Sequence, residues 1–204
     1  MTQIRFPFDP EKLVQALVFF SQGGVRDLSK MKAAKLLFYA DKYHLLKYGR
    51  PVIGDQYACM EYGPVPSTSL NVMNDVIDGD PDFPPVSKKL FDEYLTVEKF
   101  FKKHPVFRAK KALDLEIFSD SDIEALEYAL KNHGSKSASI LSGESHEELA
   151  WKVSNGVMMD YRLFFEGHPE AAEVLRLVEA QQEDRDVAEE FSLHRAEAEL
   201  LSLD

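Results

Sequence analysis

Three side chains between residues 35 and 70 are of the types that do acid–base chemistry. Asp41 and His44 lie three positions apart on a predicted helix, and Asp55 follows soon after that helix ends. A carboxylate and an imidazole that share a pocket can act as a general base and the group that orients it, so a hydrolase is one interpretation. His44 falls on the apolar stripe of its helix, which favours a hydrogen-bonded core histidine over a catalyst.

Other enzyme signatures are missing from the sequence. It contains no phosphate-binding loop, no G-x-G-x-x-G and no H-E-x-x-H. The nearest approach to a nucleophile elbow, at residues 143–147, lacks the second glycine and resembles a helix cap. The six histidines are dispersed and Cys59 is the only cysteine, so no spacing indicates a metal site. We therefore predict no catalytic residue, no metal and no cofactor.

Length and composition indicate one globular domain with an appendage. The chain has 204 residues, of which 45% are hydrophobic, enough to bury a core. A single cysteine excludes an intrachain disulfide, and the first residues begin no apolar run of the signal-peptide kind. No segment approaches the roughly 20 apolar residues that span a bilayer, so we expect no membrane partner. These features predict a cytoplasmic protein.

The negative charge is concentrated near the C-terminus. The whole chain has a net charge of −11, and residues 166–204 carry 12 Asp or Glu against 3 Arg. A chain of this sign repels phosphate backbones. The segment 26–50 is the exception, with seven Lys or Arg against two Asp. A solvated helix face is the favoured interpretation of this segment, and a nucleic-acid-binding regulator is the alternative.

The hydrophobic pattern predicts a mainly α fold: a compact helical domain over 1–165 with a small β-hairpin, and an acidic helical extension over 166–204. Asp9 with Pro10 begins the first helix, which ends at the glycines 23–24, and Ser29 begins a second that ends at Gly49. Apolar residues of this second helix form one stripe, so its lysines are expected outside or at the margins. These lysines are Lys32, Lys35, Lys42 and Lys47.

After Gly49 the pattern changes from helical to extended. Residues 51–53 and 56–62 predict a hairpin around a turn at 54–55, and the Gly63–Pro66 run predicts a sharp turn before a helix capped by Ser67 or Thr68. Further helices are expected over 87–103, from a capping box at Ser119, from Ser135 to Leu141 and from a second box at Ser145. Residues 106–117 are ambiguous, and a strand near 113–117 is one interpretation of them. Residues 157–165 are apolar enough to be buried.

Two segments together resemble a known family. They are KLLFYADKYHLLKYGRPVIGDQYACMEYGPVPS at residues 35–67 and SGESHEELAWK at 142–152. Their motifs and order resemble the Panacea domain of SocA-like antitoxins and phage-associated GepA-type proteins, over residues 13–151. Two positions depart from the pattern: the order of the Phe38–Tyr39 pair varies in the family, and Leu149 replaces a frequent proline.

The resemblance implies a non-enzymatic, mostly helical domain that binds and neutralises a cognate protein toxin, which is usually encoded beside it. It also implies a second mode, in which the antitoxin is a proteolytic adaptor that delivers its toxin to a ClpXP-type protease. Many relatives carry an added DNA-binding domain. Residues 152–204 are too acidic to be one, so a nucleic-acid partner is not expected.

A binding role predicts that the lysine-rich helix and the turn at 57–66 form one rigid surface. Tyrosine and arginine are enriched among binding hot spots, and rigidity reduces the entropy lost on association. Asp41 and His44 then either fix the backbone of the turn or face the partner, and Asp41 and Tyr62 could instead only join the helix to the hairpin. The candidate partner-binding residues are Tyr39, Asp41, Tyr43, His44, Arg50, Asp55, Tyr57, Tyr62 and Pro64.

The acidic extension keeps apolar residues at helical spacing, including Val174, Val178, Phe191, Leu200 and Leu201. Such a pattern is typical of an amphipathic helix and not of a purely solvating acidic run. We expect 169–180 to pack on the protein's own core. Residues 185–204 could do the same or meet a basic surface of the partner.

Overall fold

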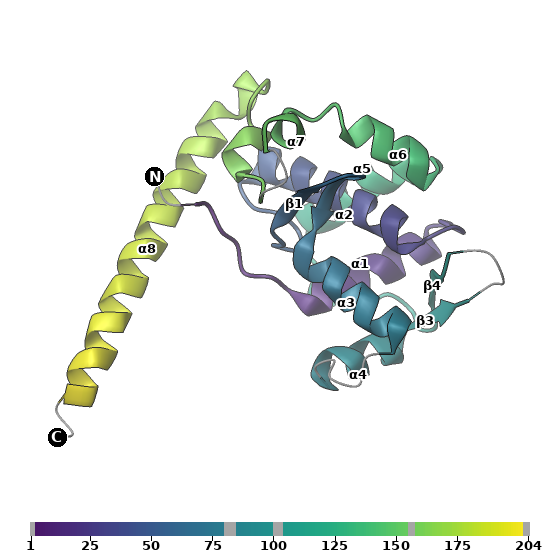
Figure 1. The fold of residues 1–204 in the computed structure, drawn as a ribbon, viewed down its shortest axis with the longest axis horizontal. Helices are drawn as coiled ribbons and strands as arrows, with labels where there is room; N and C mark the ends of the chain where they lie inside the picture. Colours follow the sequence, from purple (N-terminus) through teal and green to yellow (C-terminus); the bar gives the residue numbers. More distant parts are fainter. Residues whose placement is uncertain (1–2, 80–84, 100–103, 155–157, 202–204) are drawn as a thin grey trace.

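The fold is built around one central helix. The computed structural model describes residues 3–79, 85–99, 104–154 and 158–201. Within them, helix α2 (Lys30–Tyr48) contacts α3, α5, α6 and α8 and the second strand of a hairpin, and it is buried on most of its circumference (Figure 1). A helix enclosed in this way needs small and apolar residues on several faces, and Ala33, Ala34, Leu36, Leu37 and Ala40 provide them.

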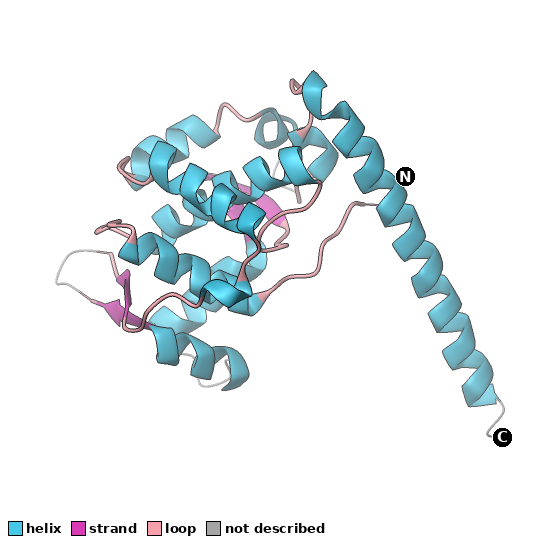
Figure 2. Cartoon of the chain, turned by 180° about the vertical axis from the view of Figure 1, so that it is seen from behind, coloured by secondary structure: helices cyan, strands magenta, loops and turns pink. Residues whose placement is uncertain are grey.

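Helices dominate the described residues, as the sequence predicts, and the strands form two small antiparallel pairs (Figure 2), one more than predicted. The other α-helices are α1 (Pro10–Gln22), α3 (Ser67–Asp78), α4 (Pro85–Tyr94), α5 (Asp120–His133), α6 (Ala138–Ser145), α7 (Leu149–Ser154) and α8 (Ala172–Leu201). The strands are β1 (Tyr57–Met60), β2 (Gly63–Pro66), β3 (Leu95–Glu98) and β4 (Val106–Ala109). Short 3-10 turns are η1 (Leu115–Ile117), η2 (Tyr161–Phe164) and η3 (Pro169–Ala171).

The predicted ends of the first helices are confirmed. Asp9 caps α1 by accepting from the N–H groups of Glu11 and Lys12, and Ser29 caps α2. Gly49 ends α2 with φ of 75°, in the left-handed region that glycine adopts without strain. Ser119 and Asp122 form the predicted capping box of α5. Local side-chain chemistry therefore sets these boundaries.

The predicted hairpin is wrong in its register. Residues 51–53 form no strand, and the Gly63–Pro66 run, predicted as a turn, is strand β2 paired with β1. Met60 pairs with Gly63, so only Glu61 and Tyr62 form the turn. Gly63 has φ of 92° and makes so tight a reversal possible. The prolines of β2 are compatible with pairing because a two-stranded hairpin has few ladder bonds for them to break.

Several later predictions also need correction. Helix α4 ends at Tyr94 and is followed by β3, while residues 100–103 of the predicted helix lie outside the described part of the chain. The ambiguous stretch 106–117 does contain a strand, but it is β4 at its start, and residues 115–117 form the 3-10 turn η1. Ser137, not Ser135, caps α6. Ser145 is the last residue of α6, with its hydroxyl donating to the Ser142 carbonyl, and the next helix, α7, begins at Leu149 without the predicted box. No side chain of Ser67 or Thr68 caps α3.

Two lysines of α2 contradict the prediction of a solvated basic face. Lys32 and Lys35 are each 1% exposed. The ammonium group of Lys32 reaches Asp27 over 2.5 Å, and that of Lys35 donates to the Pro64 carbonyl over 2.8 Å. A long lysine stem adds apolar contacts on the way to such an acceptor, so its position on a crowded helix does not force it outward.

Helix α8 packs on the core at its start and leaves it further along. Val178 and Gln182 are buried, which agrees with the prediction for 169–180, whereas Phe191 is 72% exposed. The extended N-terminal segment lies against the middle of the helix, where Arg5 N–H donates to Gln182 Oε1. Figure 1 shows the C-terminal half projecting beyond the other helices. The division at residue 165 stays a prediction.

Candidate functional site

Asp41 fixes the backbone that follows α2. Its Oδ1 accepts the N–H groups of Val52 at 2.8 Å and Ile53 at 3.0 Å, and its Oδ2 accepts the Tyr57 hydroxyl at 2.9 Å. Burial raises the pKa of the Asp41 carboxyl to about 7, against these hydrogen bonds, which lower it. Of the two roles expected for Asp41, the structure therefore has the one that holds backbone donors.

His44 has a comparable structural role, one turn further along α2, at the start of the same loop. Its Nδ1 lies 2.6 Å from the Arg50 carbonyl oxygen and must donate to it, since a carbonyl only accepts. Its Nε2 lies 3.0 Å from Ser121 Oγ. Burial lowers the pKa of the His44 imidazole, which favours the neutral ring. The prediction of a hydrogen-bonded core histidine is confirmed.

Arg50 is part of an ion cluster around Asp122. The Asp122 carboxylate is buried and lies 2.8 Å from Arg50 Nη1 and 2.8 Å from Lys12 Nζ. Burial acts to raise the pKa of this carboxyl, but hydrogen bonds from Arg50, Lys12 and the Ser119 N–H lower it to about 2. The cluster joins α1, α5 and the loop that follows α2, and it occupies the Arg50 guanidinium that the sequence predicts as a partner contact.

Asp55 caps α3 from outside that helix. Its carboxylate accepts the N–H groups of Thr68 at 2.9 Å and Ser69 at 2.6 Å, which supplies the cap that the Pro66 side chain cannot. Its carbonyl accepts the Tyr161 hydroxyl. Asp55 is 1% exposed. The side chains of Asp41, His44 and Asp55 thus each bind neighbouring polar groups and do not converge on a described cavity.

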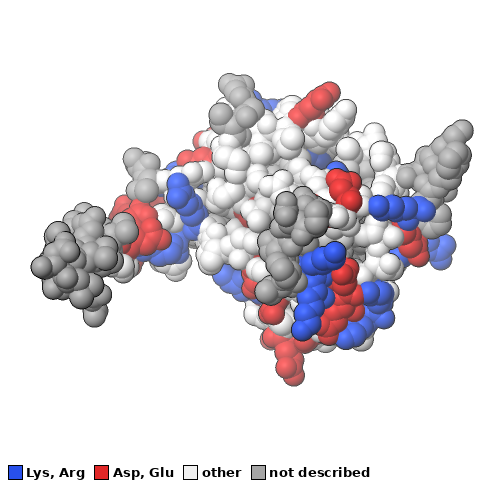
Figure 3. Space-filling model, turned by 60° about the horizontal axis from the view of Figure 1, so that its bottom comes forward, with Lys and Arg blue, Asp and Glu red and all other residues white. Residues whose placement is uncertain are grey.

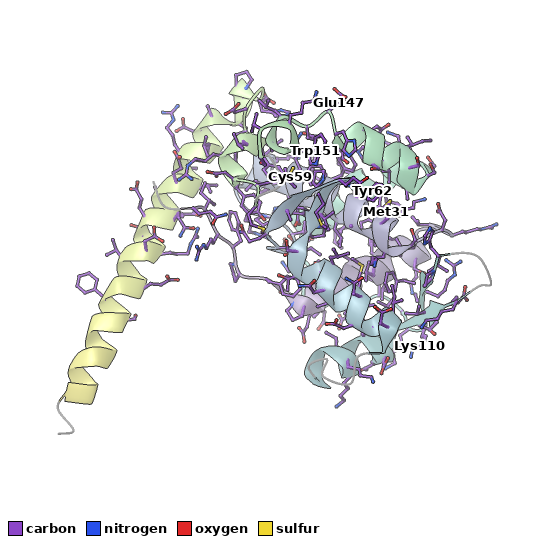
Figure 4. The ribbon with its side chains drawn as sticks, viewed as in Figure 1. Met31, Cys59, Tyr62, Lys110, Glu147 and Trp151 are labelled. Atoms are coloured by element: carbon purple, nitrogen blue, oxygen red, sulfur yellow. The ribbon has the colours of Figure 1, made fainter. Side chains whose placement is uncertain are left out.

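The second family-like segment clamps the hairpin. Trp151 Nε1 donates to the Met60 carbonyl at 3.0 Å, and the Cys59 thiol donates to the Trp151 carbonyl at 3.3 Å (Figure 4). Ser142 Oγ donates to the Tyr62 carbonyl at 2.9 Å, at the hairpin turn. The Trp151 ring stacks on His146 with centroids 4.1 Å apart. Residues 142–151 therefore hold a small hairpin that lies 80 to 92 residues earlier in the chain.

A buried lysine lies under the same hairpin. Lys35 Nζ donates to the carbonyl of Pro64, and burial lowers the pKa of this ammonium group to about 7. The side chains of Lys35 and Ser145 fill the space beside Gly63. A Cβ at this position would lie 2.6 Å from Lys35 Nζ and closer still to Ser145 Oγ. Pro64, a predicted partner contact, is itself buried.

Tyr62 is the hairpin residue that reaches solvent. It is 54% exposed, whereas Tyr57 is 1% exposed and bound to Asp41. Other large apolar side chains around the hairpin are exposed as well, from α2, β1 and the segment that bridges to β1. We define this surface as the hairpin face. Its members are Met31, Met60, Tyr62 and Met158.

Tyr39 and Tyr43 line a different feature, a cavity of about 710 Å³ between α2, α5, α6 and the residues before α8. Tyr39 stacks on His133 with centroids 3.7 Å apart, and Tyr43 stacks on Tyr128 at 4.2 Å. We call this the tyrosine cavity. Glutamates 144, 148 and 170 and two lysines of α2 share its wall. The two tyrosines are thus occupied by neighbouring rings and are separate from the hairpin face.

The basic segment 26–50 forms no free basic face, because five of its seven basic side chains are buried or paired. More generally, on the face drawn in Figure 3 Lys and Arg side chains are interspersed with Asp and Glu. The five are Lys32, Lys35, Lys42, Lys47 and Arg50. Among the described residues, His, Cys, Asp and Glu side chains form no group of three or more that could hold a metal ion.

The exposed members of the hairpin face were mostly missed by sequence reasoning. Trp151 was part of the family-like motif, but nothing indicated that its indole would reach Met60. Met31 lies one residue after the start of α2 and belongs to no pattern of its own. Hairpin register was the missing information, because it decides which side chains of 57–66 face outward.

A family model described as "Antitoxin SocA-like, Panacea domain" matches residues 34–152. The matched range runs from α2 to α7. It contains the hairpin β1–β2 and the segment 142–152 that holds it. No curated protein and no solved structure matches the chain. None of the described helices has both the length and the apolar character needed to cross a membrane.

Proposed function

Because the chain belongs to the family of SocA-like antitoxins with a Panacea domain, we propose that it neutralises a partner toxin by direct binding through the hairpin face. The observation that carries the proposal is the exposure of Tyr62 and Met60 on a hairpin whose backbone is held by Trp151 and Ser142. Exposed aromatic and methionine side chains on a rigid support are typical of contact surfaces, since little entropy is lost when they bind.

Burial reduces the set of residues that can touch the toxin. Five of the predicted contact residues are buried and support the fold beneath this surface: Asp41, His44, Asp55, Tyr57 and Pro64. Their substitution would affect binding through the fold. Tyr62 is the predicted contact residue that remains at this surface, and Arg50 is partly exposed but paired with Asp122.

The proposal includes a non-enzymatic mechanism. The three side chains of the hydrolase alternative are buried, and each is engaged with polar groups of the protein itself. A general base needs a path to a substrate proton, and none of these three groups lines the tyrosine cavity. A nucleic-acid regulator is disfavoured by the pairing of the basic residues in 26–50.

Co-expression tests the proposal. The toxin encoded beside this chain should arrest growth when expressed alone, and co-expression of this chain should restore growth and yield a complex that co-purifies. Rescue without a complex would contradict direct binding. Deletion of the ClpXP-type protease from the same strains distinguishes direct inhibition from the adaptor mode. Direct inhibition of the toxin still restores growth without the protease, whereas rescue that depends on degradation of the toxin is lost.

The distal part of α8 is proposed as a steering element. It projects from the fold and belongs to the acidic segment 166–204, so it suits a basic partner. Charge complementarity of this kind raises the association rate more than the affinity. A chain truncated after Glu183 should stay folded and associate with the toxin more slowly, with a weaker salt dependence. Unchanged kinetics would contradict steering.

A further inference from the structure

A second cavity, of about 670 Å³, opens beside the hairpin turn. Its wall combines the first turn of α2, the Tyr62 turn, the end of α3, the residues just before β4 and the first turn of α6. We call it the turn groove. Figure 4 shows Met31 and Tyr62 next to each other, and both line the groove. The groove is therefore continuous with the hairpin face.

One part of the turn groove is apolar. Met31 is 37% exposed and Tyr62 54%, and Ile77 contributes from the end of α3. Methionine and tyrosine side chains bind an apolar group favourably, because their apolar surface is buried while the tyrosine hydroxyl stays hydrated. A concave surface with such residues at its mouth suits a side chain inserted from a partner better than a flat contact.

The charged part of the turn groove is positive. None of the described residues that line it is Asp or Glu, in a chain whose net charge is −11. Lys30 lines the groove, and its Nζ donates to Asn74 Oδ1, a neutral acceptor. Within the described part of the chain, no carboxylate lies within salt-bridge distance of Lys30. The tyrosine cavity differs, because three glutamates share its wall.

Two helices begin at this groove, and their N-termini add to its positive electrostatic potential. Ser29 caps α2 and Ser137 caps α6, and both serines line the groove. Each serine hydroxyl accepts one N–H group, whereas the first turn of a helix presents several without an intrahelical partner. These N–H groups carry partial positive charge, so they act together with the Lys30 ammonium on a bound anion.

We propose that the turn groove holds a segment of the partner toxin in which an apolar side chain lies next to an aspartate or glutamate. The apolar group packs on Met31 and Tyr62, and the carboxylate meets Lys30 and the first turns of α2 and α6. The inference rests on the proposed function and names the chemistry of the partner segment. A groove without acidic lining also discriminates, because basic segments find no counter-charge there.

Variants of the groove test the proposal with the purified cognate toxin. Lys30→Glu should weaken binding at least tenfold, with a loss that shrinks at high salt, and Lys30→Met should weaken it less. Ala138→Trp, which fills the groove from α6, should also weaken binding. Lys131→Glu makes the same charge change at an exposed site of α5 and should bind as the wild type does. Circular dichroism and melting temperature confirm that each variant is folded.

A charge exchange identifies the partner residue. Each surface Asp or Glu of the toxin is replaced by Lys in turn, and one of these changes should restore binding to the Lys30→Glu chain. Recovery by no toxin variant, or unchanged binding by Lys30→Glu and Lys30→Met, would overturn the carboxylate contact. Unchanged binding by Ala138→Trp would overturn insertion into the groove.

The outcomes separate this inference from the proposed function. If the groove variants bind normally while Tyr62→Ala does not, the toxin contacts the hairpin face and the groove inference is wrong. If the wild-type chain forms no complex at all, the proposed function fails. A labelled single-stranded oligonucleotide is the probe for the other anionic ligand: binding that Lys30→Glu abolishes would show a nucleic-acid site and overturn the proposal.

Discussion

The indole N–H of Trp151 donates to the carbonyl oxygen of Met60 over 3.0 Å, and so ties α7 to the end of a strand 91 residues earlier in the chain. A second hydrogen bond runs in the opposite direction, because the Cys59 thiol donates to the Trp151 carbonyl. Strand β1 is therefore held along its side as well as by its pairing with β2. A two-stranded hairpin alone is marginally stable in water, so such clamping is needed to keep the Tyr62 turn rigid.

Removing only the indole donor should loosen the hairpin. Trp151→Phe keeps an aromatic ring against His146 but leaves the Met60 carbonyl without its partner, and we expect a loss of about 1 kcal/mol in the free energy of unfolding. Hydrogen exchange of the amides of β1 and β2 should accelerate. Tyr128→Phe is the matched control, at a site outside the hairpin. Equal exchange in wild type and Trp151→Phe would argue against the clamp.

A pair of glycine substitutions tests the packing below the turn. Gly63→Ala should cost at least about 2 kcal/mol of stability, because φ is 92° and the new Cβ meets Lys35 and Ser145. Gly143→Ala lies within α6 with open space at its Cβ, and it should stabilise the protein by about 0.5–1 kcal/mol. Urea denaturation measures both. The account fails here if the two changes have the same sign.

Asp41 should be among the most sensitive positions of the chain. Asp41→Ala leaves the N–H groups of Val52 and Ile53 and the Tyr57 hydroxyl buried without an acceptor, and about 3 kcal/mol or more of stability should be lost. The exposed Asp92→Ala should change stability by no more than about 0.5 kcal/mol. A small effect of Asp41→Ala would mean that water replaces the carboxylate.

Lys35 should make stability depend on pH. The pKa of its ammonium group is lowered from 10.5 to about 7 in the folded chain, so the unfolded chain binds more protons between these values. Stability contributed by this group therefore rises as pH increases from about 7 to 10.5, by a few kcal/mol in order of magnitude.

The difference between wild type and Lys35→Met isolates that contribution. Other groups titrate equally in both, so the stability of the wild type relative to Lys35→Met should improve steadily from pH 7 to 10. Lys131→Met, at an exposed site, should show no such trend. A flat difference for Lys35→Met would mean that the buried ammonium group keeps its ordinary pKa.

Features encoded within a few residues were predictable from the sequence. The caps of α1, α2 and α5 depend on a serine or aspartate and the next three N–H groups, and they appear where the pattern indicated. The family was recognisable for a related reason: its motifs mark conformations that need particular residues, such as Gly49 at a helix end.

Features that depend on distant partners were not predictable in the same way. Asp55 caps a helix that begins twelve residues later, and Lys35 finds its acceptor at Pro64, so neither role follows from local periodicity. The candidate surface changed for this reason. Tyr57 and Tyr62 are both tyrosines of one hairpin, yet register buries the first and exposes the second.

The affinity of the purified toxin for the Tyr62→Ala chain tests the central claim most directly. Tyr62 is exposed and accepts the Ser142 hydroxyl through its backbone, so truncation of its side chain should leave the fold intact. If the hairpin face binds the toxin, titration calorimetry should show a loss of at least about 1 kcal/mol for Tyr62→Ala. Leu115→Ala, at a residue of similar exposure on η1, should show none. A folded Tyr62→Ala chain that binds the toxin with wild-type affinity would contradict the account.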